Sequence, residues 1–278
     1  MPLLRCPHCD AALKRAGEAV RCGEGHAFDV ARQGYLSLLA GESPHEVDTS
    51  EMVAARERFL GGGHFEPLAA ELAEVVAEAV ERGGEAPPVV LDLGAGAGFH
   101  LARVLDRLPG ARGLALDVSK PALRRAARAH PRLAAVAADA WRPLPLDDAV
   151  VAAVLDVFAP RNPTELARVL QPKGGLAAIV TPASGHLEEL AGPLGLIGVQ
   201  VDKDDRLAER LRPHLDVVAR RPLQWPLRLD RSAARDAAAM GPSAFHIDPA
   251  DLDERVAALP QRVDVTAAVT ITLATRLP

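Results

Sequence analysis

The stretch Val90-Leu91-Asp92-Leu93-Gly94-Ala95-Gly96-Ala97-Gly98-Phe99-His100 decides the fold of this chain. An apolar run leads into three glycines at alternate positions, and a helical pattern starts directly after the last one. Such a turn lets a ligand come close to the backbone and to the N-terminus of the following helix. A dinucleotide-binding fingerprint has its third glycine one residue later. The stretch therefore predicts a strand, a ligand-binding turn and a helix, in a ligand-binding class other than the dinucleotide-binding one.

Short apolar runs alternate with helical segments after this turn, which is typical of a mostly parallel α/β sheet. The expected strands are residues 89–93, 113–118, 133–138, 149–155 and 176–180, and the expected helices are residues 99–107, 121–129, 163–170 and 186–194. Two runs at 215–218 and 225–229, with an alternating run at 263–275, predict a final antiparallel pair.

Acidic residues end the next two expected strands. Asp117 ends the second strand, 23 residues after Gly94, where its carboxylate can accept both hydroxyls of a ribose. Asp139 ends the third strand, followed by Ala140, at the level of an adenine edge. Either aspartate alone could be a simple strand-end cap, but together with the turn they predict a nucleoside-bearing cofactor. With Asp92 included, the pattern D-x-G-x-G-x-G resembles that of S-adenosylmethionine-dependent methyltransferases.

Every cysteine of the chain lies near the N-terminus, in the pattern C-x2-C, twelve residues, then C-x3-H. The four candidate ligands are Cys6, Cys9, Cys22 and His26. This spacing is typical of a tetrahedral zinc site, and a site closed by four protein ligands is structural. One alternative is three structural cysteines beside an unrelated histidine, and another is His8 as the fourth ligand with a strained geometry. We expect residues 1–40 to form a zinc-binding module for recognition.

Length and composition limit the remaining possibilities. The 278 residues exceed one typical domain, so residues 41–84 are expected to form a linker with helical segments and residues 85–278 the large domain. A net charge of −5 gives no global nucleic-acid signature, and no signal peptide or bilayer-spanning apolar stretch is present in the sequence. Cysteines in zinc spacing fit a reducing compartment. We expect a soluble, cytoplasmic protein without a membrane partner.

Local basic patches would then have to provide any contact with RNA. The densest basic stretch runs from Arg206 to Arg235 and contains eight arginines. It is explained equally well as an RNA track and as a solvated face.

The sequence resembles the 23S rRNA (guanine-N1)-methyltransferases, in particular the branch that confers tylosin and mycinamicin resistance in macrolide-producing actinobacteria. The resemblance runs nearly end to end, and the order of a zinc module before a methyltransferase makes it specific. The motifs that carry it are Cys6-Pro7-His8-Cys9, Cys22 to His26, Phe28 to Tyr35, Gly63 to Leu68, Asp117 to Pro121, Val157 to Pro163, Thr181-Pro182, His186-Leu187 and Met240 to His246. Phe65 and Phe245 depart from the family, which often has Tyr and usually has Trp there.

The resemblance implies an α/β, class I (Rossmann-like) S-adenosylmethionine methyltransferase fold with a mostly parallel seven-stranded sheet, preceded by the small zinc-binding module. It implies methylation at N1 of a guanine in the hairpin-35 loop of domain II, at the peptide exit tunnel, with resistance to tylosin-type macrolides. It also implies a homodimer. The alternatives are a small-molecule methyltransferase with an accessory zinc module and a non-catalytic RNA-binding protein of the same fold.

The expected site residues follow from the turn, the strand ends and the resemblance. Those for the cofactor are Phe65, Asp92, Gly94, Gly96, Gly98, Phe99, Asp117, Asp139, Ala140 and His186. By resemblance, His186 contacts the cofactor and Phe65 covers its methionine end, and a helix-capping role is the alternative for His186. At the end of the fourth strand, the candidate catalytic residues are Asp156, for the N1 proton, and Phe158, for stacking on the base. A structural carboxylate and a core phenylalanine are the alternatives.

Overall fold

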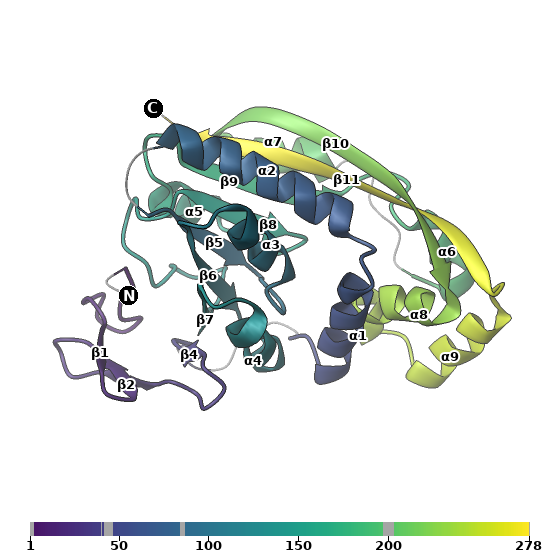
Figure 1. Ribbon diagram of the computed structural model, residues 1–278, viewed down its shortest axis with the longest axis horizontal. Helices are drawn as coiled ribbons and strands as arrows, with labels where there is room; N and C mark the ends of the chain where they lie inside the picture. The colour runs from purple at the N-terminus through teal and green to yellow at the C-terminus, as the bar shows by residue number, and fades with distance from the viewer. Residues whose placement is uncertain (1–2, 40, 42–46, 84–86, 197–202, 278) are drawn as a thin grey trace.

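The computed structural model describes residues 3–39, 41, 47–83, 87–196 and 203–277. Positions 42–46 and 84 of the predicted linker and positions 85–86 of the predicted large domain lie outside these residues. A twisted eight-stranded sheet forms the centre of the large domain, and a small three-stranded sheet lies beside it at the N-terminal end (Figure 1). Within the described residues, no helix is long and apolar enough to cross a bilayer.

Seven strands of the large sheet have the order β7-β6-β5-β8-β9-β11-β10. They are β5 (Val89–Leu93), β6 (Arg112–Asp117), β7 (Leu133–Ala137), β8 (Ala153–Val157), β9 (Leu176–Pro182), β10 (Leu215–Asp230) and β11 (Arg262–Arg276). The first five are parallel, and β11 runs antiparallel to both β9 and β10. The predicted mostly parallel sheet with a final antiparallel pair is confirmed. The N-terminal segment adds an eighth strand, β4 (Leu36–Ser37), parallel to β7, which the sequence did not predict.

Helices cover both faces of the sheet, and each face has its own core. The helices of one face include α2 (Glu66–Gly83), α3 (Phe99–Arg107) and α4 (Lys120–Ala129), and those of the other include α5 (Pro163–Val169) and α7 (Lys203–Leu211). Along β5, Val90 belongs to the first core and Leu91 to the second. Burial on both faces explains why these strands are continuous apolar runs. Helix α2, predicted as part of the linker segment, packs within the first core.

Three predicted strand segments have clearly different bounds in the structure. The strand expected at 149–155 is β8 and begins only at Ala153, because Ala149 has a left-handed φ of 58° and Val151 makes only an isolated bridge. The two runs expected at 215–218 and 225–229 are one strand, β10. Its interior contains Pro222 and Pro226, which suggest a break in the sequence. An edge strand tolerates proline because the missing N–H would face no partner.

The connection between β10 and β11 contains helices that the sequence did not reveal. They are α8 (Arg231–Ala239), a 3-10 turn (Pro242–Phe245) and α9 (Pro249–Ala258). Helix α1 (Ser50–Gly61) packs against α8 (Figure 1). Arg58 joins the two helices, with its Nη2 2.6 Å from Asp236 Oδ1 and its Nε 3.0 Å from Asp236 Oδ2. Asp236 is buried, so this two-pronged ion pair fixes α1 beside the carboxyl ends of the parallel strands.

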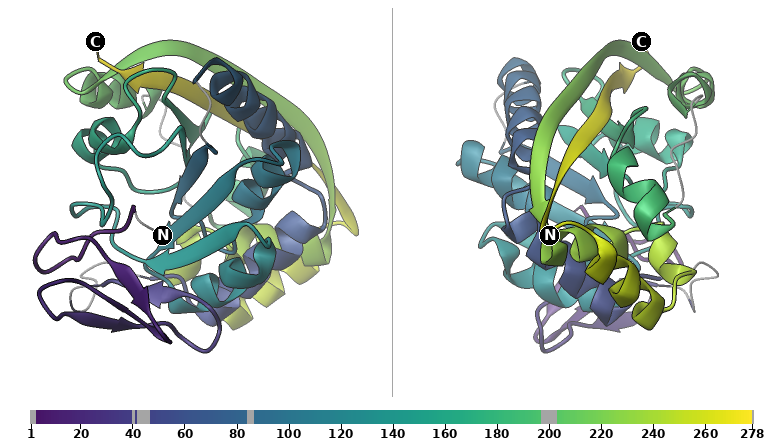
Figure 2. Two further views of the ribbon diagram at one scale, coloured as in Figure 1. Left: turned by 60° about the vertical axis from the view of Figure 1, so that its left-hand side comes forward. Right: turned by 90° about the vertical axis from the view of Figure 1, so that its right-hand side faces the viewer.

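The zinc module is packed onto the large domain. Its small sheet consists of β1 (Lys14–Ala16), β2 (Ala19–Arg21) and β3 (Ala27–Asp29), all antiparallel (Figure 2). On either side of it, Arg5 N donates to Pro145 O at 2.9 Å, and Leu38 N donates to Ala137 O at 2.9 Å. One apolar cluster contains Leu4, Leu13 and Leu36 of the module and Leu144 and Leu146 of the large domain. The two parts therefore share a core.

Candidate cofactor, substrate and zinc sites

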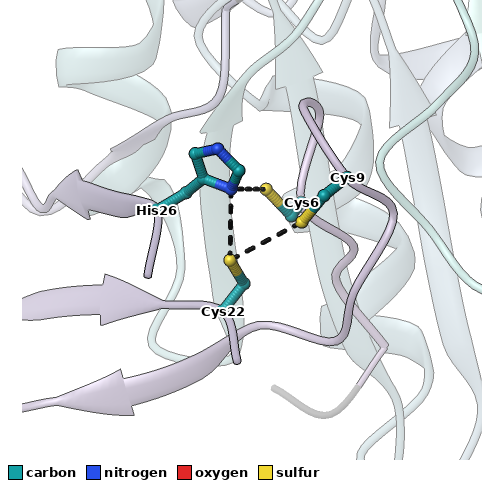
Figure 3. A group of neighbouring side chains, drawn as sticks. All are labelled: Cys6, Cys9, Cys22 and His26. Carbon is teal, nitrogen blue, oxygen red and sulfur yellow. Dashed lines mark hydrogen bonds between the residues drawn. The ribbon is translucent and has the colours of Figure 1, made fainter. Parts of the chain in front are cut away.

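The four predicted zinc ligands lie together between two turns of the N-terminal module (Figure 3). His26 Nδ1 is 3.6 Å from Cys6 Sγ and 3.4 Å from Cys22 Sγ, and Cys22 Sγ is 3.7 Å from Cys9 Sγ. All four ligand atoms lie within 4.8 Å of one another. A tetrahedron with Zn–S bonds of about 2.3 Å and Zn–N bonds of about 2.0 Å separates its corners by about 3.5–3.8 Å. The donor set therefore fits a structural zinc ion in type and in spacing.

Backbone turns place these side chains. Cys6 N donates to Ala11 O at 2.9 Å, and Cys22 N donates to His26 O at 3.0 Å, which closes each knuckle. His8, the rival fourth ligand, lies outside this cluster. Its ring packs at 12° to that of Phe28, with centroids 5.8 Å apart. The structure thus agrees with His26 as the fourth ligand.

The three glycines of the turn after β5 all have positive φ, at 63°, 54° and 80° for Gly94, Gly96 and Gly98. At Gly94 a side chain is excluded on a second ground, because a Cβ would lie 2.5 Å from the Cβ of Ala159. The loop after β8 is thus packed directly on this turn. At Gly96 a Cβ would meet only atoms beyond 3.6 Å, so this part of the turn keeps room for a ligand.

Asp117 and Asp139 form a row with the glycine turn along the carboxyl edge of the sheet, since β5, β6 and β7 are neighbours. Asp117 accepts from Gly96 N through Oδ2 at 2.8 Å and from Ser119 N through Oδ1 at 2.7 Å. Burial raises the pKa of the Asp117 carboxyl group above its ordinary value. Asp139 accepts from the backbone N–H of Trp141 at 2.9 Å. Turn, first acid and second acid have the order that a nucleoside lying across the strands would need, so the residues present fit S-adenosylmethionine.

Phe99 and Ala140 occupy the two ends of this row. Phe99 is the first residue of α3, and the guanidinium of Arg103 lies 5.1 Å from the centre of its ring. Ala140 is buried directly after Asp139. The structure places both beside the predicted cofactor edge.

Two further carboxylates lie beneath the site. Asp92 and Asp156 are 2% and 0% exposed. Burial raises the pKa of Asp92 well above its ordinary value, and the charges of Asp117 and Asp156 add to the rise. Burial also raises the pKa of Asp156, to about 7, although the nearby Arg161 guanidinium opposes the change. Neither carboxylate lies at the surface of the site.

Arg161 is the cationic partner of Asp156. Its Nε donates to Asp156 Oδ2 at 3.1 Å, and its Nη2 donates to Ala159 O at 2.7 Å. Among the described residues, Asp156 Oδ1 has no hydrogen-bond partner. The pair thus ties the loop after β8 to the end of its own strand, which fits the structural alternative for Asp156.

An aromatic cluster forms where β8 and β9 end. Phe65, just before α2, has its ring centroid 6.3 Å from that of Phe158 and 6.0 Å from that of His186, and the last two are 5.7 Å apart. Phe65 is 2% exposed, whereas Phe158 is 43% exposed and has a left-handed φ of 55°. Phe158 is therefore not a core residue, and its ring is available to a ligand.

His186 lies after β9 and before α6 (Glu188–Leu194), whose N-cap is Leu187. The helix-cap alternative for His186 therefore does not describe this structure. Its Nδ1 accepts a hydrogen bond from Ala268 N at 3.2 Å, and burial lowers its pKa. The ring is consequently neutral near pH 7, with its proton on Nε2, where it can act as a donor.

Two residues of the site had no assigned role in the sequence. Trp225 packs edge-on against Phe65, with centroids 5.3 Å apart, and its Nε1 donates to His64 O at 2.8 Å. Arg161 lies in the Val157 to Pro163 segment, one of the motifs that carry the family resemblance, but its contact with Asp156 was not predicted. The one signal for Trp225 in the sequence was its rarity, since the chain has two tryptophans. An alternating apolar pattern does not reveal a contact with a residue far away in the sequence, such as Phe65.

Three arginines of the basic stretch between Arg206 and Arg235 lie beside carboxylates in the structure. Arg221 Nη1 lies 2.9 Å from Glu71 Oε1, and Arg235 Nε lies 2.5 Å from Asp253 Oδ1. Arg228 lies 3.8 Å from Asp264. These pairs favour a solvated face over an RNA track.

Comparison with known proteins gives two family models and several relatives. The model described as "RlmA, N-terminal", a zinc ribbon, matches residues 4–43, and a "Methyltransferase domain" model matches residues 90–174. The chain is 50% identical over 275 residues to the 23S rRNA (guanine(748)-N(1))-methyltransferase of Streptomyces fradiae, covering 99% of this chain and 97% of the relative. It is 52% identical over 283 residues to a provisionally named 23S rRNA (guanine-N(1)-)-methyltransferase of Micromonospora griseorubida, covering 97% and 96%.

A solved structure supports the fold alone. A chain in the complex between a Haloferax volcanii methyltransferase activator and a methyltransferase superposes with a TM-score of 0.50 at 23% identity. The match covers 84% of this chain and 100% of that chain.

The zinc cluster generates the first prediction. Cys22→Ser should release one equivalent of zinc, because three remaining ligands cannot close a tetrahedron. Elemental analysis of the purified variant measures the metal, and limited proteolysis should show a loosened N-terminal module. Binding of S-adenosylhomocysteine by the large domain should persist. His8→Ala removes a ring that lies 5.1 Å from that of His26 but is not one of the four ligands, so this variant should keep its zinc. Finding no zinc in the unmutated protein would contradict the assignment.

The edge of the sheet generates the second prediction. Asp117→Ala should weaken S-adenosylhomocysteine binding by about 2–3 kcal/mol, because both ribose hydroxyls lose a charged acceptor. Isothermal titration calorimetry measures the change, and circular dichroism checks the fold. The control is Asp148→Ala, a carboxylate that is 76% exposed and binds Arg168 away from the turn, and it should bind normally. Unchanged affinity in a folded Asp117→Ala protein would remove Asp117 from the ribose site.

Proposed function

Because this chain belongs to the 23S rRNA (guanine-N1)-methyltransferase family, we propose that it methylates N1 of the guanine equivalent to 748, the position named for its Streptomyces fradiae relative. We place this guanine in the hairpin-35 loop of domain II. The observation that carries the proposal is the full-length match, which includes the zinc module as well as the cofactor-binding half. A small-molecule methyltransferase would have no need of such a module.

The chemistry of the target defines what the site must do. Guanine N1 bears a proton at neutral pH and is a poor nucleophile until that proton leaves. Bound S-adenosylmethionine supplies an electrophilic methyl group. The protein must hold N1 in line with that group, keep water out and let the proton depart. Orientation therefore accounts for most of the catalysis.

The aromatic cluster is suited to this positioning. A base in a loop can leave its stack and pack against an exposed aromatic ring. We assign this contact to Phe158, since it is exposed beside the end of β8. Phe65 and His186 form the wall behind it, against the methionine end of the cofactor. The neutral His186 can donate from Nε2 but cannot accept the N1 proton there.

Asp156 is assigned to positioning, through Arg161 and the loop that carries Phe158. Its carboxylate is completely buried and engaged with Arg161 in this structure, so it does not reach the surface on which a base would lie. Its raised pKa, near 7, is the property that direct handling of the N1 proton would also require. The two roles differ in how they respond to an isosteric substitution.

The remaining parts of the proposal concern the biological setting. The added methyl group removes a Watson–Crick donor and places bulk on the tunnel wall, where the sugar arms of tylosin-type macrolides would pass. We therefore propose that the protein confers tylosin resistance in the cytoplasm of a sensitive bacterium. We further propose a homodimer in which two zinc modules enclose the stem-loop.

Methylation of 23S rRNA tests the function directly. Incubation with S-adenosylmethionine and 23S rRNA from a host lacking the modification should add one methyl group at N1 of the predicted guanine. Primer extension would stop there, because the methyl blocks Watson–Crick pairing, and mass spectrometry of the digested RNA identifies the base. A methyl group on another base, or on no RNA, would refute the proposal. The second result would favour a small-molecule substrate.

A substitution series tests the role of Asp156. Asp156→Asn should lower the single-turnover rate by less than about tenfold, since the amide oxygen still accepts from Arg161. Asp156→Ala and Arg161→Ala should lose more, because both release the loop. S-adenosylhomocysteine binding serves as the control for an intact cofactor site. A loss of about a hundredfold or more in Asp156→Asn, as expected for removal of a general base, would instead assign the N1 proton to Asp156.

A further inference from the structure

Arg56 lies over the open part of the glycine turn. A Cβ at Gly96 would have Arg56 Nη1 at 3.7 Å and Arg56 Cδ at 3.8 Å as its neighbours. The side chain comes from the second turn of α1, a helix that no cofactor motif in the sequence includes. Its side chain is 28% exposed, so it is not sealed in the core.

Two contacts hold the guanidinium at this place. Nη2 donates to Met240 O at 2.5 Å, in the connection between α8 and the 3-10 turn, and Nη1 forms an ion pair with Asp48. These two bonds use two of the five N–H donors of a guanidinium. Arg58, two residues on, fixes the same helix to α8 through Asp236. Arg56 is therefore presented to the turn in a fixed position with donors still available.

The direction of the cofactor determines what chemical group would arrive there. The adenine and ribose are assigned to Asp139 and Asp117, at the ends of β7 and β6. Because β5 is the next strand of the sheet, the amino-acid end of the cofactor must continue towards the turn that contains Gly96. This end bears a carboxylate. An arginine matches a carboxylate in charge and in geometry, and Asp48 demonstrates that a carboxylate already binds this guanidinium.

The local charge balance supports the same conclusion. The carboxylates of Asp117 and Asp48 both lie near the turn, and Asp48 raises the pKa of Asp117 whereas Arg56 lowers it. A further carboxylate brought to this place would be repelled by both aspartates. A nearby cation is needed to offset this repulsion, and Arg56 is in contact range of the turn.

We propose that Arg56 binds the carboxylate of the methionine moiety of S-adenosylmethionine, with Asp48 as its partner when the cofactor is absent. The assignment concerns the cofactor alone and does not depend on which RNA base is methylated. It makes α1 part of the cofactor site, although that helix lies before the methyltransferase motifs in the sequence.

Ligand truncation tests the proposal without any activity measurement. Calorimetry compares S-adenosylhomocysteine with S-adenosyl-3-thiopropylamine, which lacks only the carboxylate. Arg56→Ala should weaken S-adenosylhomocysteine about ten- to hundredfold, the usual range for a hydrogen bond to a charged group, and the truncated ligand less than about twofold. Arg56→Lys should give an intermediate loss, because lysine keeps the charge but not the paired donors.

The comparison of two ligands on one variant also controls for folding, since a partly unfolded protein would weaken both equally. Arg125→Ala is the matched variant. Arg125 Nε binds Glu57 of α1 at 2.8 Å, but only Arg56 has side-chain atoms within 4 Å of a Cβ at Gly96, so both ligands should keep their affinities. Equal losses for the two ligands in Arg56→Ala, or no loss for either, would overturn the proposal. Equal losses would give Arg56 a structural role.

Discussion

The close packing of the loop after β8 on the glycine turn after β5 is the constraint on which the site depends. Gly94 is in van der Waals reach of Ala159, so even one methyl group at position 94 would push the two segments apart. The same loop presents Phe158 in a left-handed conformation that non-glycine residues rarely adopt. Arg161 offsets this local strain by binding both Ala159 and Asp156. The turn after β5 and the loop that carries Phe158 are therefore packed as one unit.

The strand order explains how the glycine turn and two acidic residues from separate segments come to one edge of the sheet. Parallel strands deliver their carboxyl ends to the same side of the sheet, so the turn, Asp117 and Asp139 follow the strand order. The aromatic cluster needs more than topology. Phe65 enters it from outside the sheet, because α2 packs on the same face as α3 and Trp225 of the edge strand supports its ring.

Much of this architecture was predictable because it follows local patterns. Helix α3 begins and ends at the expected residues, since glycine punctuation and 3.6-residue periodicity are signals within a short window. The zinc ligands were identifiable from spacing alone. By contrast, β10 was predicted as two pieces, because the effect of proline depends on whether a strand lies at an edge, which is a property of the whole sheet. The ion pair of Arg58 joins segments that are far apart in the sequence, and the ion pair of Arg161 involves a carboxylate that becomes buried on folding. No local pattern in the sequence encodes either pair.

The placement of β4 bears on how the two outer edges of the large sheet are kept from pairing with other molecules. One outer strand, β10, contains Pro222 and Pro226, which discourage pairing with another molecule. The opposite side would end in β7, a wholly apolar strand, if β4 did not cover it through Leu36 and Ser37. The segment that covers it is continuous with the knuckles that carry the four candidate zinc ligands. A zinc ion held by these knuckles would therefore also keep β4 in place, and so limit the pairing of β7 with a strand of another molecule.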